Sequence, residues 1–247
     1  MISVCLASYN GEKYIREQID SIISQLSEND ELIISDDGSS DDTMRIVEGY
    51  VDSRIKILHH GAPHGVVHNF ENALRHAKGD YIFLSDQDDV WLPDKVFIFM
   101  EAFERTGAEV LLSDCKMSDG ALNVISESKF KEENIGIGVW KNIVKCGYLG
   151  SCMAFRKECL SDFLPIPKNK YLFHDIWIGL TSGSVRKFEL INKPTMIYRR
   201  HDATVTATGF SKIGVKYNNA NSLLFKIIKR FAIVGSYLKW RIARIRR

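Results

Sequence analysis

Short apolar segments alternate with amphipathic segments along the first 115 residues of the chain. The apolar runs have the length and β-branched character of buried strands and lie at 2–7, 32–34, 55–58, 81–84 and 110–112. Between them, apolar residues recur at helical spacing, as between residues 15 and 26. This alternation predicts an α/β fold in which a mostly parallel sheet is flanked by helices.

Polar clusters follow four of these runs. They are Tyr9-Asn10, Asp36-Asp37, residues 86–89 and Ser113-Asp114. Because ligands of parallel α/β sheets bind beyond the carboxyl ends of the strands, we expect these side chains to lie around one ligand site.

Local signals mark some of the helix ends. Ser39 and Asp42 resemble a capping box for a helix that continues through Val51. Gly79 is expected to end the helix that contains Phe70 and Leu74.

The second half of the chain is less regular. We expect a loop-rich excursion at 116–139, a strand at 150–156, a short helix from His174, and strands at 186–191 and 195–199. The sequence thus predicts one domain at 1–210, with halves 1–115 and 116–210, and a separate tail at 211–247.

Composition excludes several classes of protein. The 247 residues are 45% hydrophobic and 26% charged, with a net charge of +2, as in an ordinary globular protein. The five cysteines have no CxxC spacing, so neither a disulfide framework nor a zinc site is indicated. No signal peptide or membrane-spanning run is visible, which favours a cytoplasmic location.

The acidic run after residue 84 carries the strongest chemical signal. Asp86, Asp88 and Asp89 would repel one another unless a cation neutralises them. Oxygen ligands suit Mg²⁺ or Mn²⁺, which complete their coordination with water and phosphate. A solvated acidic turn is the alternative, and the neighbouring pair Asp36-Asp37 argues against it.

Three motifs together resemble the inverting glycosyltransferases of family 2. They are ISVCLASYNG at 2–11, SDDGSSDDT at 35–43 and LSDQDDVWLPDK at 84–95. The resemblance covers roughly residues 1–205 and implies a GT-A fold, in which a Rossmann-like nucleotide-binding half merges with an acceptor half.

The resemblance also implies roles for residues of the first half. Ala7, Tyr9, Asp36 and Asp37 would line the nucleoside pocket, with Asp37 near the base. Asp86 and Gln87 would approach the ribose or the sugar, and Asp88 would bind Mn²⁺ or Mg²⁺. Asp89 would support Asp88, while Trp91 would shape the site and Lys95 would lie on a helix surface.

The second half would supply the catalytic base. The family takes it from a Glu-Asp or His-Asp pair at a helix start, which here is His174-Asp175, so Asp175 would accept the proton of the acceptor hydroxyl. Trp177 would lie beside the acceptor or in the core. Gly150 and Ser151 would let a sugar approach the backbone closely.

Residues 198–201 stand where processive relatives carry a Q-x-x-R-W motif. That motif is absent, which favours the addition of a single sugar. Arg200 would contact the diphosphate, and His201 would complete the metal site.

The tail combines an apolar stripe with basic residues. The stripe is Leu224, Ile227, Phe231, Val234, Leu238, Ile242 and Ile245. Such a helix favours binding to an anionic membrane surface, here the inner face of the cell membrane. The alternative is that the helix docks on the domain. No motif for reading nucleic acid accompanies it.

The sequence therefore predicts an enzyme that transfers one sugar to a saccharide acceptor, linked to a polyprenyl diphosphate, during synthesis of O-antigen, capsule or exopolysaccharide. A UDP-hexose is the favoured donor, followed by dTDP-rhamnose. A nucleotidyltransferase is the second hypothesis, but residues 8–12 offer no basic glycine-rich loop for a triphosphate. An inactive nucleotide-sugar sensor or membrane scaffold is the third.

Overall fold

The first half of the chain forms the parallel part of the sheet. The computed structural model describes residues 1–59, 61–144, 146–201 and 223–246. The elements of this half are β1 (Ile2–Ser8), α1 (Ile15–Ile23), β2 (Glu31–Asp36), α2 (Thr43–Glu48), β3 (Ile55–His59), α3 (Val66–His76), β4 (Tyr81–Asp86), β5 (Val90–Trp91), α4 (Lys95–Thr106) and β6 (Val110–Ser118). Strand β1 pairs in parallel with both β2 and β4, and β2 pairs in parallel with β3.

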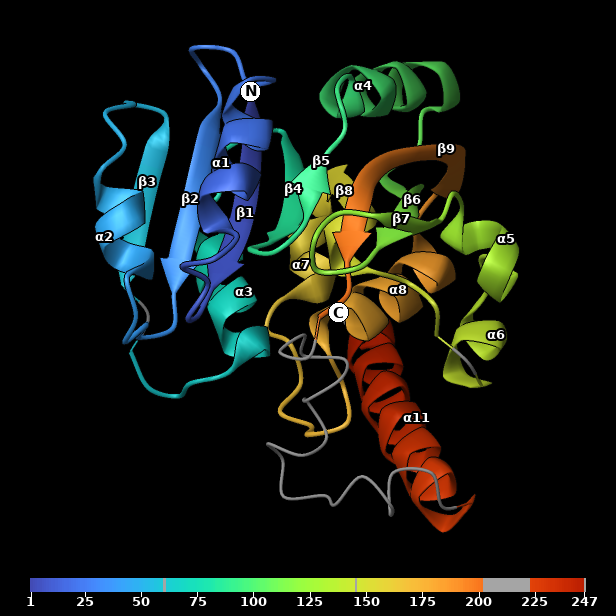
Figure 1. Ribbon diagram of the computed structural model, residues 1–247. Coiled ribbons are helices and arrows are strands. Elements are labelled where there is room, and N and C mark those ends of the chain that lie inside the picture. Colours follow the sequence, from blue (N-terminus) through green and yellow to red (C-terminus); the bar gives the residue numbers. More distant parts are fainter. Residues whose placement is uncertain (60, 145, 202–222, 247) are drawn as a thin grey trace.

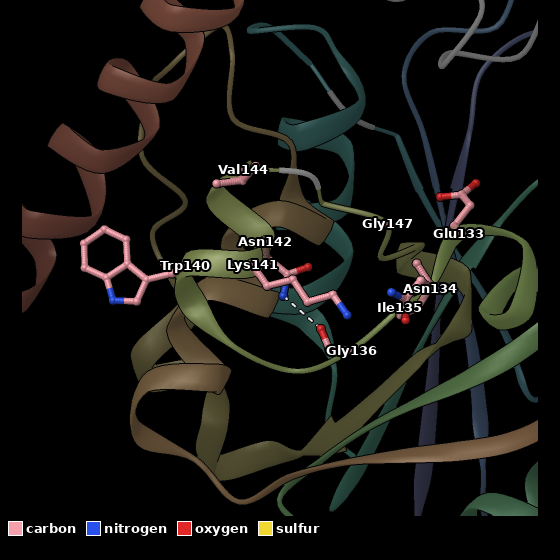
Figure 2. A pocket seen from close by; sticks show the side chains of 9 residues that line it. All are labelled: Glu133, Asn134, Ile135, Gly136, Trp140, Lys141, Asn142, Val144 and Gly147. Atoms are coloured by element: carbon pink, nitrogen blue, oxygen red, sulfur yellow. Dashed lines mark hydrogen bonds between the residues drawn. The ribbon is translucent and has the colours of Figure 1, made fainter.

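The second half adds shorter elements around the same sheet. They are β7 (Val124–Ser126), α5 (Lys129–Glu133), α6 (Val139–Val144), β8 (Met153–Arg156), α7 (Leu160–Phe163), α8 (His174–Val185), β9 (Phe188–Arg199) and α11 (Leu223–Ile245), with 3₁₀ turns at Gly150–Cys152 and Lys157–Cys159. The loop before α6 is fixed by Asn142, whose amide donates to the carbonyl of Gly136 (Figure 2). The excursion expected at 116–139 contains the end of β6, strand β7 and helix α5, and helix α6 begins at its last residue.

The sheet of the described residues is mixed. Its nine strands run in the order β3-β2-β1-β4-β8-β6-β9-β5, with β7 against β6. Strand β8 pairs antiparallel with both β4 and β6, so β6 still runs in the same direction as β4. The carboxyl ends of β1, β2 and β4 therefore meet at one edge, the lower edge in Figure 1, and β6 points the same way.

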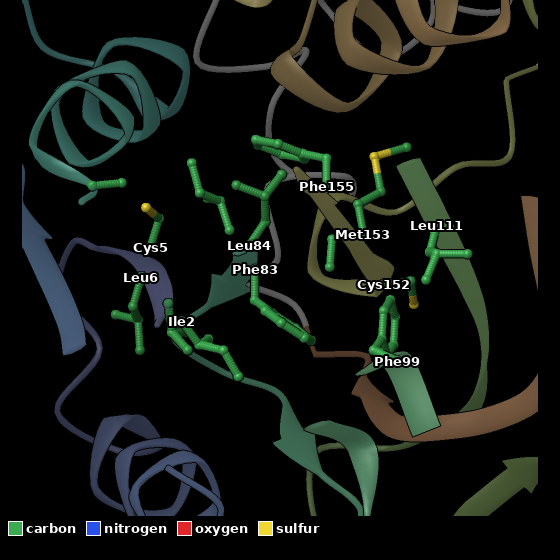
Figure 3. Close-up of a cluster of buried hydrophobic side chains, with 14 of the residues drawn as sticks. Ile2, Cys5, Leu6, Phe83, Leu84, Phe99, Leu111, Cys152, Met153 and Phe155 are labelled. Atoms are coloured by element: carbon green, nitrogen blue, oxygen red, sulfur yellow. The ribbon is translucent and has the colours of Figure 1, made fainter. Parts of the chain in front are cut away.

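The core lies on both faces of this sheet. Successive side chains of a strand point to opposite faces, and Figure 3 shows Cys5 and Leu6 doing so. The cluster extends without a break across β8, where Met153 and Phe155 are fully buried. One continuous core thus joins the two halves.

Four local expectations were wrong. Helix α2 begins at Thr43 and ends at Glu48. The Ser39 hydroxyl forms no capping box, because it accepts from the backbone nitrogen of Asn10 and donates to Asp36. Helix α3 ends at His76, with Ala77 as its C-cap, and Gly79 instead lies against β1, where a Cβ would come within 2.5 Å of the Ser3 nitrogen.

The other two errors concern α4 and the end of the domain. Lys95 is completely buried, although a helix-surface position was expected. The two strands expected at 186–199 form one bent strand, β9, whose register against β6 shifts near Pro194. The domain boundary expected at 210/211 lies outside the described residues.

Candidate active site

The carboxylates at the end of β4 form an electrostatically strained group. Desolvation raises the pKa of Asp86 and Asp89, and the charge of Asp88 raises both further. One oxygen of Asp89 is buried without a hydrogen-bond partner among the described residues. A cation beside these groups would relieve the repulsion that their ionised forms suffer.

Asp88 and His201, the two residues predicted to bind a metal, lie next to each other. Nε2 of His201 is 3.0 Å from Oδ2 of Asp88, and the imidazole packs against Tyr14 with ring centroids 4.7 Å apart. The described residues contain no group of three or more His, Cys, Asp or Glu side chains arranged to hold a metal ion. A carboxylate and an imidazole fit an ion that takes its remaining ligands from water and phosphate.

Arg199 holds this corner of the site together, and the sequence analysis missed it. Its backbone nitrogen donates to Oδ1 of Asp89 at 3.1 Å, and its Nε donates to the carbonyl of Asp88 at 2.9 Å. The guanidinium also pairs with Glu17 and lies 4.5 Å from the centre of the Tyr14 ring. The expected Arg200 is exposed instead, because residues 199 and 201 share the inward side.

Buried Lys95 lies beneath the acidic loop. Its Nζ donates to the carbonyl of Ser151 at 2.7 Å and stands 4.3 Å from the centre of the Trp91 ring. Burial lowers the pKa of Lys95 to about 8, while nearby acidic groups, Asp86 and Asp89 among them, oppose that shift. Trp91 is also buried, so these two residues pack together in the core next to the acidic loop.

Asp36 organises the loop after β2. Its carboxylate accepts hydrogen bonds from the Ser8 hydroxyl at 3.0 Å and from the backbone nitrogens of Gly38 and Ser39 at 3.0 and 2.8 Å. These contacts occupy both oxygens. Asp36 thus stabilises the loop after β2, and its predicted contact with the nucleoside stays a prediction.

The other expected nucleotide contacts lie on neighbouring loops. Asp37 faces His64, with Nδ1 at 3.0 Å, and accepts from the backbone nitrogen of Gly65 at 2.8 Å. Gln87 exchanges two hydrogen bonds with the backbone of Tyr9, at 2.8 and 2.9 Å. Ala7 pairs with Asp86 across β1 and β4. Gln87 therefore ties the loops after β1 and β4 together.

A cavity of about 350 Å³ joins the end of β4 to the start of α8. The expected site residues that line it are Asp86, Asp88, Gly150, His174 and Asp175. Residues 7, 9 and 37 are not among those that line it. The structure thus brings the expected metal ligand and the expected base into one cleft.

Asp175 and His174 face this cavity from the first turn of α8. Burial raises the pKa of Asp175 to about 6. The His174 ring stacks on Phe70 with centroids 3.9 Å apart, and neither ring nitrogen has a hydrogen-bond partner within the described part of the chain. Burial lowers the pKa of His174 to about 3, so its imidazole is neutral at physiological pH.

Gly150 and Trp177 serve the packing around this pair. A Cβ on Gly150 would come within 2.4 Å of Nε2 of His174, so this glycine makes room for the imidazole. Gly150 also lines the cavity, and the predicted close approach of a sugar to its backbone stays a prediction. Trp177 is buried, and its Nε1 donates to the carbonyl of Phe163 at 2.8 Å.

Comparison with known proteins decides the family. Residues 3–164 match the profile described as "Glycosyl transferase family 2". The chain is 38% identical over 239 residues to the Escherichia coli UDP-Glc:alpha-D-GlcNAc-diphosphoundecaprenol beta-1,3-glucosyltransferase WfaP, covering 96% of this chain and 92% of WfaP. The chain belongs to glycosyl transferase family 2.

This family 2 glycosyltransferase is also similar to a second named relative. It is 29% identical over 213 residues to the dTDP-rhamnosyl transferase RfbG of Shigella flexneri, covering 80% of this chain and 72% of RfbG. Several other relatives are matched over less than half of their length.

The fold also resembles glucosyl-3-phosphoglycerate synthase from Mycobacterium tuberculosis, solved with Mn²⁺, UDP and glucosyl-3-phosphoglycerate. The TM-score is 0.58 at 20% identity, and the match covers 87% of this chain and 81% of that one. The glycosyltransferase therefore has a GT-A-like fold, in which helices flank a curled central sheet.

The C-terminal helix α11 of the glycosyltransferase is docked through one face. Ile233 is buried, and Trp240 meets Trp177 edge-on with ring centroids 5.9 Å apart. Tyr237 donates its hydroxyl to Ser184 at 2.7 Å. The predicted apolar stripe lies elsewhere on the helix: all its members except Val234 are 37–78% exposed. Helix α11 thus packs on the domain through one face and exposes most of its apolar stripe on another.

Among the described residues, no helix has both the length and the apolar character needed to cross a bilayer.

Proposed function

We propose that this protein transfers one sugar, with inversion, from a nucleotide-sugar donor to an acceptor hydroxyl. The observation that carries the proposal is that Asp86, Asp88 and Asp175 line one cavity. Membership of family 2 supports the transferase activity independently of this geometry.

The proposed reaction is a single displacement at the anomeric carbon. The acceptor oxygen bonds to that carbon as its bond to the diphosphate oxygen breaks, and Asp175 takes the hydroxyl proton. A pKa near 6 keeps Asp175 ionised at neutral pH and still basic enough to accept the proton. Neutral His174 can hydrogen-bond an acceptor hydroxyl on either ring nitrogen.

Asp88 and His201 would hold a divalent cation, Mn²⁺ or Mg²⁺. When bound, the cation stabilises the negative charge that develops on the leaving diphosphate. The Mn²⁺ and UDP bound to the Mycobacterium synthase support this assignment. Arg199 keeps the backbone of the Asp88 loop in place for that cation.

A UDP-hexose is the proposed donor, and a saccharide on a polyprenyl diphosphate is the proposed acceptor. The activity in the name of WfaP, which matches nearly the whole chain, supports both. A dTDP-rhamnose donor is the alternative, supported by RfbG. Either reaction would belong to surface-polysaccharide biosynthesis.

A panel of nucleotide sugars with Mn²⁺ or Mg²⁺ tests this function. Release of nucleoside diphosphate is scored with and without a GlcNAc-diphosphate-lipid acceptor, and NMR of the product gives its anomeric configuration. Acceptor-dependent release with an inverted product is expected. Release of pyrophosphate from a nucleoside triphosphate would favour a nucleotidyltransferase, and no turnover of any donor would favour an inactive sensor.

The exposed stripe of α11 supports a second proposal, binding to the inner face of the cell membrane. Exposed apolar residues such as Phe231 and Leu238 alternate with basic residues on this helix. Exposed Trp140 and Val144 lie on adjacent α6, whose Val144 carbonyl accepts from Arg230 of α11 at 3.0 Å. Figure 2 shows Trp140 extending away from α6.

Sedimentation with vesicles containing anionic lipid tests the membrane proposal. The variant Phe231→Asp should bind the vesicles at least about tenfold more weakly, because it places a charge in the apolar stripe. The control Val51→Asp changes an exposed valine on the far part of the domain and should bind like the unchanged protein. Equal binding by both variants would contradict the proposal.

A further inference from the structure

A buried lysine lies next to the acidic loop, residues 86–89, at the end of β4. Lys95 is the first residue of α4, and its side chain is completely buried. Its Nζ donates to the carbonyl of Ser151 at 2.7 Å, lies 3.7 Å from the sulfur of Met196, and stands 4.3 Å from the centre of the Trp91 ring. All three partners are uncharged. Burying an ammonium group among uncharged partners is unfavourable unless negative charge lies close enough to stabilise it.

The carboxylates of the acidic loop supply that negative charge without touching the lysine. Burial lowers the pKa of Lys95, and the charges of Asp89 and Asp86 oppose that shift. Burial raises the pKa of Asp86, and the charge of Lys95 opposes that shift in turn. The ammonium group and these two carboxylates therefore stabilise one another through the core.

Ser151 stands between the lysine and the carboxylates. Its carbonyl accepts the hydrogen bond from Lys95. Its hydroxyl opposes the rise in pKa that burial causes in Asp86 and in Asp89, so it lies beside both carboxylates. Ser151 is itself completely buried, in the turn that precedes β8. One residue of the protein, and no water-filled space, thus separates the positive charge from the negative charges.

The balance of charge at this edge of the sheet suits one divalent cation. The guanidinium of Arg199, the other cation beside the acidic loop, is paired with Glu17. Lys95 forms no ion pair within the described part of the chain. When the three carboxylates of the acidic loop are ionised, the charge of Lys95 offsets one of them. Two negative charges remain, which is the charge that one Mn²⁺ or Mg²⁺ neutralises.

We propose that Lys95 is a positioning residue whose buried ammonium group is the permanent counter-charge of the acidic loop and limits how tightly the site holds its divalent cation. The inference rests on the proposed function, because it assumes the cation site at Asp88. When the cation is absent, the ammonium group reduces the repulsion within the loop, so the loop keeps its position. When the cation is bound, the same charge repels it, which favours its release with the nucleoside diphosphate.

Binding of Mn²⁺, measured by electron paramagnetic resonance with and without UDP, tests the counter-charge. Lys95→Met removes the charge and should bind Mn²⁺ about tenfold more tightly than the unchanged protein, since charges in the core are poorly screened. Lys95→Gln keeps a donor for the Ser151 carbonyl and should show the same gain. Met196→Leu changes a neighbour of the ammonium group without changing the charge, and it should bind Mn²⁺ like the unchanged protein.

The direction of the change separates an effect of charge from damage to the loop. A lysine that only packs against the loop would give weaker or unchanged Mn²⁺ binding when it is replaced, and that result in both neutral variants would overturn the proposal. A gain with Lys95→Met that Lys95→Gln does not share would also overturn it, because the effect would then follow the hydrogen bond to Ser151.

Thermal unfolding covers the case in which a neutral variant folds poorly. Excess Mn²⁺ with UDP should raise the Tm of each neutral variant about 3 °C more than that of the unchanged protein, because tighter binding stabilises the folded state further. A variant that folds only with Mn²⁺ would support the proposal, since the cation then replaces the lost charge. Failure of both variants to fold with and without Mn²⁺ would overturn it.

The unchanged protein separates this inference from the proposed function. If it binds no Mn²⁺, with or without UDP, the cation site of the proposed function is wrong. If it binds Mn²⁺ and the neutral variants bind it no more tightly, only the role of Lys95 is wrong.

Discussion

Polar side chains differ between the loops after β1 and β2, in the donor half (residues 1–115), and the start of α8, in the acceptor half. After β1 and β2, polar groups bind one another: Asn10 accepts from the Ser40 nitrogen at 2.8 Å, and Asp36 and Gln87 are similarly engaged. In the acceptor half, both ring nitrogens of His174 lack a partner among the described residues. The two regions nevertheless share one edge of the sheet.

This contrast separates groups that build the site from groups that act in it. A buried polar group without a partner costs about 1–3 kcal/mol. Such a cost is tolerated where a ligand supplies the missing partner. His174 is therefore expected to meet substrate, whereas Asp36 and Gln87 hold the loops in a preorganised shape.

The largest effect is expected when the proposed cation ligand of the donor half, Asp88, is removed. Asp88→Asn should lower the rate of sugar transfer about 10³-fold, because the leaving diphosphate loses its electrostatic stabilisation. The rate is measured as nucleoside diphosphate release at saturating Mn²⁺. Asp80→Asn, at the opposite end of β4, is the matched control and should retain full activity. Comparable rates for the two variants would remove Asp88 from its role.

Arg199 and Arg200 test whether a buried arginine stabilises the loop that contains Asp88. Arg199→Met should lower the free energy of unfolding by about 2–3 kcal/mol, because it leaves the carbonyls of Asp88 and Gly120 without their donor. Exposed Arg200→Met should change it by less than about 0.5 kcal/mol. Urea unfolding of both variants measures the difference. Equal stabilities would show that Arg199 does not hold the loop.

The fall of the rate at acid pH tests the role of Asp175 in the acceptor half without a mutation. Asp175 must be ionised to accept a proton, and burial raises its pKa to about 6. Turnover should therefore be constant above pH 7 and fall by about tenfold for each pH unit below pH 6. Initial rates at saturating donor and metal from pH 5 to 8 give this profile. A flat profile down to pH 5 would contradict the assignment of the base.

Much of the donor half could be predicted because its information is local. Buried strands followed by polar turns are visible in the sequence, and the sheet direction places their ends together. Lys95 was also predictable in principle: it lies on the same helical face as Phe99 and Phe103, which are buried. Its charge concealed that pattern.

The acceptor half could not be predicted to the same extent because its geometry depends on long-range contacts. No local signal places β8 between β4 and β6, and none brings Lys229 to Asp175. The capping box failed for a related reason, since the Ser39 oxygen accepts from the backbone nitrogen of Asn10, a residue of a distant loop. Motifs located the reacting groups, whereas tertiary packing decided which of their neighbours hold them.

Transfer by Asp175→Asn tests the central claim most directly, because the account requires a base in the same cleft as the Asp88 cation site. The rate of acceptor glycosylation should fall by about 10²- to 10⁴-fold, while donor binding with Mn²⁺, measured by calorimetry, stays within about twofold. Glycosylation at the unchanged rate by a folded Asp175→Asn protein would contradict the account.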